Sequence, residues 1–314
     1  MNPDDGYISY IVNPCSGRGT GGSLIWELKD YLLSRKFDVR VSLTKSLEHA
    51  QQLGRDAVAD DKCKLIIVAG GDGTIRDVAA VTINSGKPIL PVPCGTENLL
   101  ASELGYDEKL STLLKTFEDG HTVDYDLCKA GDKVFASIAG FGFDAEVVRR
   151  VSMERKGNID HLDYFWPIWR TFWSHDFPSF NITLDGERLY EGPCMVFVGN
   201  LSRYAMGLHI LENADYRDGL LDVCIYECSS HFDIARFALM TVMKRHTKSS
   251  SVIYRQGKNV KISVVKGSPA SEFDGDPGPN LPLDISILPS AIKIIAPING
   301  KPAGLRTRLI RMFR

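Results

Sequence analysis

An apolar segment that runs into three glycines constrains the fold of this chain more than any other feature. Residues 64–69 are predicted to form a buried strand, and Gly70-Gly71-Asp72-Gly73-Thr74 follows it, before a predicted helix at 75–83. Glycine lets backbone N–H groups approach a ligand without a Cβ in the way, and such groups at the start of a helix bind anions. Asp72 would repel a phosphate unless Mg²⁺ or a proton intervenes. The segment therefore predicts a nucleotide-phosphate site with a metal nearby, and the alternative is a tight turn that binds nothing.

The composition is that of an ordinary globular protein. The 314 residues suffice for two domains, and 44% apolar with 24% charged residues are typical of a soluble chain. A net charge of −2 gives no overall field that attracts nucleic acid, so we expect no nucleic-acid partner. The seven cysteines form no CxxC pair, which predicts free thiols in a reducing cytoplasm, and the scattered histidines argue against a zinc site.

The pattern of predicted elements changes near residue 125. Four strands are expected before it, at 7–12, 38–43, 64–69 and 89–92. Helical segments alternate with them, at 24–34, 47–59, 75–83, 98–104 and 109–117. This alternation predicts an α/β domain with a parallel sheet. After residue 125, short strand-like runs separated by turn residues predict an antiparallel β-sandwich, interrupted by helices at 161–173 and 232–244.

We therefore predict three parts of the chain. Residues 1–125 would form an α/β nucleotide-binding domain, 126–298 a β-sandwich domain for the substrate, and 299–314 a basic amphipathic tail. Glycines or hydroxyl residues follow each predicted strand of the first domain, at 13–19, Thr44, 70–74 and 93–98. Since the carboxyl ends of parallel strands share one edge of a sheet, these segments predict one phosphate-binding site. Thr44 alone is equally well explained as a residue that starts the next helix.

Seven motifs stand in a fixed order along nearly the whole chain. They are NPCSG at 13–17, GGDGT at 70–74, GTENLLA at 95–101, GFGFDAEV at 140–147, ADYRDGLLDV at 214–223, FDGD at 273–276 and PSAIKIIAP at 289–297. With these motifs the chain resembles the diacylglycerol kinase catalytic family, which also contains sphingosine, ceramide and bacterial lipid kinases. GGDGT alone also occurs in NAD kinases, but the later motifs in this order do not.

The resemblance implies ATP-dependent phosphorylation of a lipid hydroxyl, with Mg²⁺ as a cofactor. By similarity, the nucleotide site would contain Asn13, Ser16, Gly17, Thr44, Gly70, Gly71, Asp72, Gly73, Thr74, Ile75, Arg76, Gly95, Thr96 and Asn98. The Mg²⁺-binding turn would contain Asp215, Asp218 and the backbone of Leu220, and Asp126 would join Asp72 in a second carboxylate–water–Mg²⁺ network.

The same resemblance identifies candidate catalytic residues. Asp276 stands at the acidic position that the family assigns as proton acceptor, and Asp274 is its neighbour. We count both, together with Asp72, as candidate catalytic residues. By composition alone, 274–278 would be a solvated turn between two strands.

Three features depart from the family pattern. Leu99 stands where many members have an aspartate, which puts the second metal network in doubt. Asp276 replaces a glutamate, and a displacement of about 1 Å in a catalytic group can cost about 10²-fold in rate. The segment Arg203-Tyr204-Ala205-Met206-Gly207 lacks glycines that the family has before the metal turn.

Three segments bear on lipid binding. Residues 161–173 carry six aromatic side chains, for which we favour packing in the core over an acyl-chain pocket or a membrane contact. The tail 301–314 has five cations, no acid and alternating apolar residues, which suits either an anionic membrane or docking on the first domain. The basic cluster 244–248 is interpreted as a solvated helix end.

We therefore expect a cytoplasmic lipid kinase that associates peripherally with membranes. Its substrate would be diacylglycerol, a sphingoid base or a related lipid, and a homodimer is compatible with the sequence. Two alternatives stay open. The chain could be an NAD kinase-like phosphotransferase with a soluble substrate, or a degenerate nucleotide- or lipid-binding protein without transfer activity.

Overall fold

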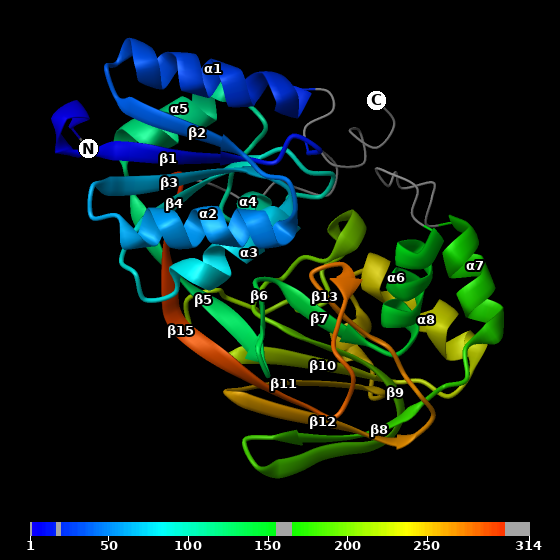
Figure 1. The fold of residues 1–314 in the computed structure, drawn as a ribbon. Helices are drawn as coiled ribbons and strands as arrows, with labels where there is room; N and C mark the ends of the chain where they lie inside the picture. The colour runs from blue at the N-terminus through cyan, green and yellow to red at the C-terminus, as the bar shows by residue number, and fades with distance from the viewer. Residues whose placement is uncertain (1, 17–19, 155–164, 299–314) are drawn as a thin grey trace. The chain divides into compact units, whose positions relative to one another are not determined.

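The computed structural model describes residues 2–16, 20–154 and 165–298 (Figure 1). These residues form two compact units. The first contains 2–125 and 290–298, and the second contains 126–289. Gly17 and the tail 299–314 lie outside the described residues, so the predictions made for them stay predictions.

The first unit contains the predicted parallel sheet. Its strands are β1 (Tyr7–Val12), β2 (Asp38–Leu43), β3 (Cys63–Gly70) and β4 (Pro88–Pro93), arranged in the order β2-β1-β3-β4. All four pair in parallel, and the end of β15 (Leu283–Ile295) adds a parallel edge to β4. β1 is buried along its whole length, as expected for a strand with both faces covered.

Helices cover both faces of this sheet. Figure 1 shows α1 (Thr20–Ser34) and α5 (Leu110–Asp119) on one face, and α2 (Leu47–Ala59) and α3 (Asp72–Thr82) on the other. The Ser46 hydroxyl caps α2 by accepting the His49 N–H, as such residues commonly do. α3 begins at Asp72, three residues before the predicted start at Ile75, because Gly71 is extended and the turn residues already adopt helical geometry.

The second unit is built from antiparallel strands. They are β5 (Thr122–Ala130), β6 (Lys133–Phe135), β7 (Ile138–Phe141), β8 (Ser179–Leu184), β9 (Glu187–Gly199), β10 (Leu221–Glu227), β11 (Val252–Gly257), β12 (Asn259–Lys266), β13 (Ser271–Phe273), β14 (Asp276–Pro277) and β15. The first part of β9 pairs with β8, and its last residues pair with β7 and β10. β9 therefore passes from one sheet to the other, and the predicted fold class is confirmed.

Helices α6 (Phe143–Glu154), α7 (Phe165–Ser174) and α8 (His231–Val242) belong to this unit. α6 is absent from the sequence prediction, although Val147, Val148 and Val151 form its buried side. The preference for core packing of 161–173 is wrong for the tryptophans of α7. Trp166 and Trp173 are each 61% exposed and Trp169 is 51% exposed, because the helix buries a side that contains Thr171 and leaves the tryptophans facing solvent. Residues 161–164 lie outside the described residues.

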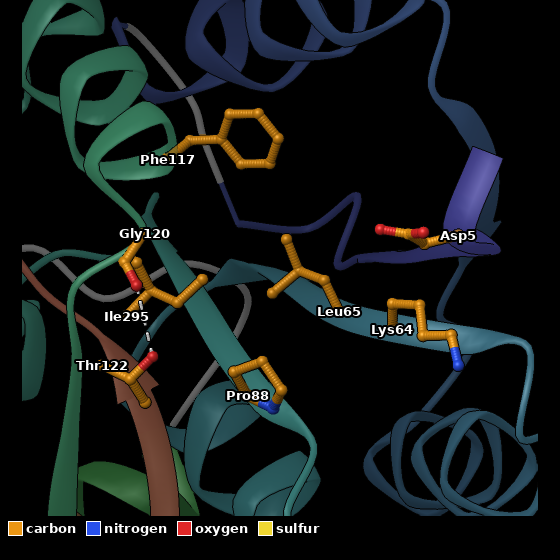
Figure 2. Close-up of a pocket in the computed structure, with 8 residues that line it drawn as sticks. All are labelled: Asp5, Lys64, Leu65, Pro88, Phe117, Gly120, Thr122 and Ile295. Atoms are coloured by element: carbon orange, nitrogen blue, oxygen red, sulfur yellow. Dashed lines mark hydrogen bonds between the residues drawn. The ribbon is translucent and has the colours of Figure 1, made fainter. Parts of the chain in front are cut away.

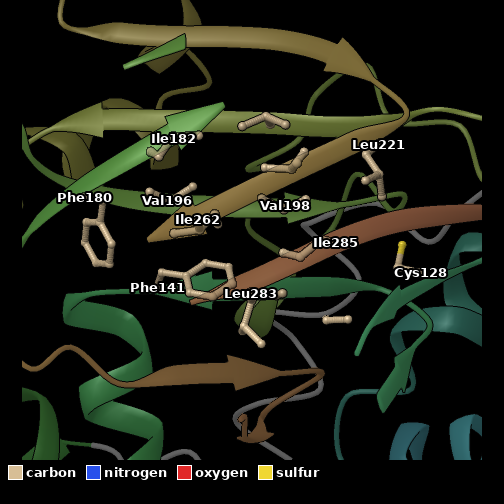
Figure 3. Close-up of a cluster of buried hydrophobic side chains, with 14 of the residues drawn as sticks. Cys128, Phe141, Phe180, Ile182, Val196, Val198, Leu221, Ile262, Leu283 and Ile285 are labelled. Carbon is tan, nitrogen blue, oxygen red and sulfur yellow. The ribbon is translucent and has the colours of Figure 1, made fainter. Parts of the chain in front are cut away.

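A hydrophobic core fills the space between the strands of the second unit. Phe141, Phe180, Val196, Ile262 and Ile285 lie together in it (Figure 3). Their positions alternate along each strand with residues of the opposite face, as the period of two residues requires.

The seven cysteines are all unpaired, which confirms the predicted free thiols.

We predict that Phe180→Ala lowers the free energy of unfolding by about 3–5 kcal/mol, because the substitution leaves a cavity in a packed core. Phe180 is fully buried, whereas Phe232 is 75% exposed. Phe232→Ala is therefore the matched control and should change stability by less than about 0.5 kcal/mol. Urea unfolding of both variants measures the difference, and equal effects would contradict this assignment of the core.

Candidate active site

The Asp72 carboxylate joins two glycine turns of the first unit. Its Oδ2 accepts the N–H of Leu99 at 3.0 Å, and its Oδ1 accepts the N–H of Leu100 at 3.1 Å. Leu99 and Leu100 open α4 (Leu99–Glu103), so Asp72 supplies the acceptor that the first turn of this helix lacks. Leu99 thus contributes through its backbone at the position where its side chain departs from the family pattern.

The two turns also approach each other through their glycines. A Cβ on Gly95 would lie 2.5 Å from the Cα of Gly71, which is closer than non-bonded carbon atoms pack. Asn98 adopts the left-handed conformation with φ 50°, and its side chain bonds both the N–H and the carbonyl of Gly95. The close approach therefore requires glycine at 95.

The turn that follows β1 is hydrogen-bonded to the glycine turn that follows β3. The Asn13 amide donates to Thr74 Oγ1 at 2.9 Å, and Asn13 Oδ1 accepts the Cys15 N–H at 3.0 Å. Ser16 donates its N–H to the carbonyl of Asn13. At the neighbouring strand end, Thr44 is buried and donates its N–H to Val12. The structure thus brings Asn13 and Thr74 together.

The beginning of α3 has backbone N–H groups without a helical partner. The Ile75 N–H bonds the Gly71 carbonyl, so the N–H groups of Gly73 and Thr74 precede the first bond of the helix. Together with the helix dipole they favour an anion at this end of the sheet. Arg76 is buried and ion-pairs with Asp77 at 3.3 Å, whereas Thr96 is exposed.

A cavity of about 490 Å³ in the first unit lies at a different place. Figure 2 shows that Lys64, Leu65 and Pro88 line it, and these residues stand at the beginnings of β3 and β4. The glycine turns stand at the opposite ends of the same strands. Ligands of parallel sheets bind at the carboxyl ends, so the turns and not this cavity are the candidate nucleotide site.

In the second unit, the Asp274 carboxylate binds the backbone. Its Oδ2 accepts the Ala136 N–H at 2.8 Å, and its Oδ1 accepts the N–H groups of Ser137 and Ile138 at 2.8 and 3.2 Å. Asp274 also has a left-handed backbone with φ 52°. Because its carboxylate accepts three backbone N–H groups, Asp274 links its own turn to the segment before β7.

Asp276 lies two residues further on, in β14. It is partly exposed, and its strand pairs with β13 through Phe273. Asp274 is partly exposed as well, so exposure alone does not single out either acid of the FDGD segment.

The predicted metal turn is held by a third aspartate, which is buried. Asp126 Oδ2 accepts the Gly219 N–H at 2.8 Å, and the Asp126 N–H donates to the Tyr216 carbonyl at 2.8 Å. Within the turn, Asp215 accepts from Arg217, and Asp218 Oδ1 accepts the Leu220 N–H. Among the described residues, no three acidic, histidine or cysteine side chains converge to hold a metal.

Sequence reasoning missed a buried acidic pair beside the FDGD segment. Glu272 is fully buried on β13, and the Tyr204 hydroxyl donates to Asp144 at 2.7 Å. Burial raises the pKa of Glu272 well above its ordinary value, and the neighbouring Asp144 raises it further. Burial also raises the pKa of Asp144 to about 6, against a smaller opposing effect of the Tyr204 hydrogen bond. Asp144 lies within a motif, but nothing in the sequence places it near Glu272.

Comparisons with known proteins agree with this geometry. The model of the diacylglycerol kinase catalytic domain matches residues 8–130, and that of the YegS C-terminal NAD kinase beta sandwich-like domain matches 137–296. The chain belongs to the diacylglycerol kinase-like family. A diacylglycerol kinase of Mycobacterium tuberculosis is 28% identical over 302 residues, which cover 94% of this chain and 96% of that protein.

Solved structures share the fold of this family member. A diacylglycerol kinase from Bacillus anthracis has a TM-score of 0.73 and 23% identity, covering 92% of this chain and 96% of that one. An NAD kinase from Archaeoglobus fulgidus in complex with ATP has a TM-score of 0.54 and 10% identity, with 98% of each chain covered. Family membership supports a kinase that uses ATP. Among the described residues, no helix is long and apolar enough to cross a membrane.

We predict that Gly95→Ala weakens nucleotide binding at least about tenfold, or about 1.4 kcal/mol, because the new Cβ forces the two turns apart. Titration calorimetry with a non-hydrolysable ATP analogue measures the effect. Gly86→Ala is the control, since nothing lies within 4 Å of its Cβ position and the residue stands away from the turns. An unchanged dissociation constant for the Gly95 variant would show that nucleotide binds elsewhere.

Proposed function

We propose that this protein is a lipid kinase that transfers the γ-phosphate of ATP to a lipid hydroxyl. The observation that carries the proposal is the pair of glycine turns held together by Asp72, in a chain of the diacylglycerol kinase-like family. The turns and the beginning of α3 offer backbone N–H groups to the phosphates. Phosphoryl transfer needs such positioning and charge neutralisation more than covalent help.

Asp276 is the proton acceptor in this proposal. Asp274 is less suited to that role, because its two oxygens already accept three backbone N–H groups. Asp72 likewise accepts two N–H groups and serves the shape of the nucleotide site. A general base of this kind contributes about 10²–10⁴-fold to the rate.

Mg²⁺ is part of the proposal, as a charge-neutralising ion for the nucleotide. It keeps several waters and binds few protein carboxylates, which suits a turn that offers Asp218 and the carbonyl of Leu220. Arg217 bonds Asp215 at 3.2 Å and competes for that carboxylate. The second network predicted with Asp126 has less support, since this side chain accepts the Gly219 N–H.

The two alternatives have weaker support. The NAD kinase shares 10% identity with this chain, which shows a common fold and nothing of the acceptor. A degenerate binding protein was suggested by Leu99 and Asp276. However, the N–H of Leu99 is bonded to Asp72, so the leucine leaves the nucleotide turns joined.

We predict that the protein transfers labelled γ-phosphate from ATP to a lipid in mixed micelles, and that Asp276→Ala lowers the rate at least about 10²-fold. Asp284→Ala, at an acid with 78% side-chain exposure on β15, is the matched control and should retain full activity. A panel of diacylglycerol, sphingoid bases, ceramide and NAD identifies the acceptor. Transfer to NAD alone, or ATP binding without transfer to any acceptor, would contradict the proposal.

We further propose that the apolar faces of α7 and α8 contact an anionic membrane, where the lipid substrate resides. Trp166, Trp169 and Trp173 project from α7 at helical spacing, and tryptophan is favoured at membrane–water interfaces. The α7 end contacts the start of α8, where Trp173 lies 5.8 Å from the His231 ring. At the other end of α8, exposed Val242 and Met243 adjoin exposed Lys244 and Arg245. The mixture of aromatic, apolar and basic groups fits an anionic bilayer.

We predict that replacing Trp166, Trp169 and Trp173 together by alanine weakens binding to phosphatidylglycerol vesicles at least about tenfold, since the apolar contact is lost. Trp26→Ala is the control, because Trp26 is 47% exposed on α1 of the first unit. Vesicle co-sedimentation measures binding, and analytical ultracentrifugation reports self-association. Unchanged vesicle binding, or loss of a dimer in place of vesicle binding, would contradict the assignment.

A further inference from the structure

Glu272 is a fully buried acid placed against the turn that carries Asp276. It stands on β13, two residues before Asp274, and is 0% exposed. Its Oε2 accepts the Gly275 N–H at 2.8 Å. Its Oε1 is also buried, and the described part of the chain provides it with no hydrogen bond of normal geometry. One oxygen of this side chain therefore holds the FDGD turn, and the other lies buried near Tyr204 without a hydrogen bond of normal geometry.

Asp144 and Tyr204 lie beside Glu272. A Cβ on Gly140 would lie 2.6 Å from Glu272 Oε1 and 2.8 Å from Asp144 Oδ2, so both oxygens crowd the same point beside this glycine. The Tyr204 hydroxyl donates its one proton to Asp144 Oδ2 at 2.7 Å. The absence of a side chain at Gly140 gives the two carboxyl groups the space to meet.

The largest influences on the pKa of Glu272 come from burial, Asp144, the Gly275 N–H, Asp274 and Tyr204, and none of these groups is a cation. On α6, Glu146 is paired with Arg149 and Arg150, at 2.7 and 3.2 Å, and β14 contributes the acid Asp276. Two buried carboxylates this close cannot both be ionised, so one of them keeps a proton.

We propose that Glu272 is neutral in the active protein and donates its Oε1 proton to Asp144, and that this hydrogen bond positions Asp276 for phosphoryl transfer. Glu272 is thus a positioning residue that acts through Gly275. This inference rests on the proposed kinase function for its catalytic readout. A neutral carboxyl group satisfies every contact, because its hydroxyl donates to Asp144 while its carbonyl oxygen accepts the Gly275 N–H.

The proposal predicts a loss of activity at alkaline pH. When Glu272 loses its proton, its Oε1 becomes an acceptor that faces another acceptor, and repulsion from Asp144 pushes the side chain away from Gly275. The position of Asp276 then changes, and a displacement of about 1 Å can cost about 10²-fold in rate. Tyr204 and Asp274 act on Glu272 and carry no positive charge that could relieve this repulsion.

Glu272→Gln tests the idea directly, because an amide donates to Asp144 and accepts from Gly275 without titrating. We expect kcat at neutral pH within about threefold of the wild type and an activity that no longer falls on the alkaline side. Glu272→Ala should lower kcat about 10²-fold with little change in the KM for ATP. Glu191→Gln is the matched control, on an exposed acid of β9 with 45% side-chain exposure, and should keep the wild-type pH profile.

A second pair of measurements does not depend on the lipid substrate. Both acids have a higher pKa in the folded chain than the ordinary value near 4 of the unfolded one. The contribution of these two acids to the free energy of unfolding is therefore greatest below about pH 4 and falls as pH rises through the folded-state values. Urea unfolding across this range should show the fall in the wild type and a shallower fall in Glu272→Gln. Infrared spectra at neutral pH should show the carbonyl stretch of a protonated carboxylic acid in the wild type and not in this variant.

The outcomes separate the two proposals. If no lipid is phosphorylated but the infrared band and the pH-dependent stability behave as stated, the kinase proposal fails and the neutral Glu272 stands. A folded Glu272→Gln that is as inactive as Glu272→Ala would overturn the inference, since Glu272 would then act as an ion. The same holds if the wild type lacks the infrared band, a measurement that applies even if the glutamine variant does not fold.

Discussion

Carboxylates that accept backbone N–H groups fix the loops on which the candidate site depends. Asp72 joins α4 to the glycine turn of β3, Asp126 holds the turn at Gly219, and Asp274 holds the segment before β7. Each acid sits in or beside a turn that contains glycine, where the backbone is otherwise least constrained. Charge-assisted bonds of this kind are stronger than those between neutral groups, so a single side chain can define a loop that has few apolar contacts.

This arrangement explains how the chain tolerates its departures from the family pattern. Leu99 removes a carboxylate, but the interaction that shapes the nucleotide turn uses the Leu99 N–H, which any residue except proline supplies. The same reasoning applies to Gly95, where the requirement is for space against Gly71 and not for a functional group. Some motif residues therefore hold the backbone in place, and the sequence alone does not distinguish them from residues that would contact a substrate.

The sequence predicted the features that follow from local periodicity. The strands of the parallel sheet, the glycine turns at their carboxyl ends and the antiparallel character of the second unit all leave a signal within a few residues. The prediction missed α6, although Val147, Val148 and Val151 are spaced as on one side of a helix. Two features leave no such signal. The tryptophans of α7 are apolar yet exposed, and the Asp274 carboxylate accepts N–H groups of residues more than 130 positions away in the sequence. Burial and long-range hydrogen bonds depend on tertiary packing, which one sequence does not encode locally.

The acids of the FDGD region illustrate what this packing adds. Glu272, Asp274 and Asp276 occupy alternate positions of one short segment, and the sequence alone does not distinguish their roles. In the structure, each has a different environment. Asp274 accepts three backbone N–H groups, Glu272 is buried beside a second acid, and Asp276 is partly exposed. Since a carboxyl group takes its chemistry from what surrounds it, three acids of one short segment differ in what each of them can do. A substitution that changes the interactions of one of these acids would therefore alter the positions of the other two.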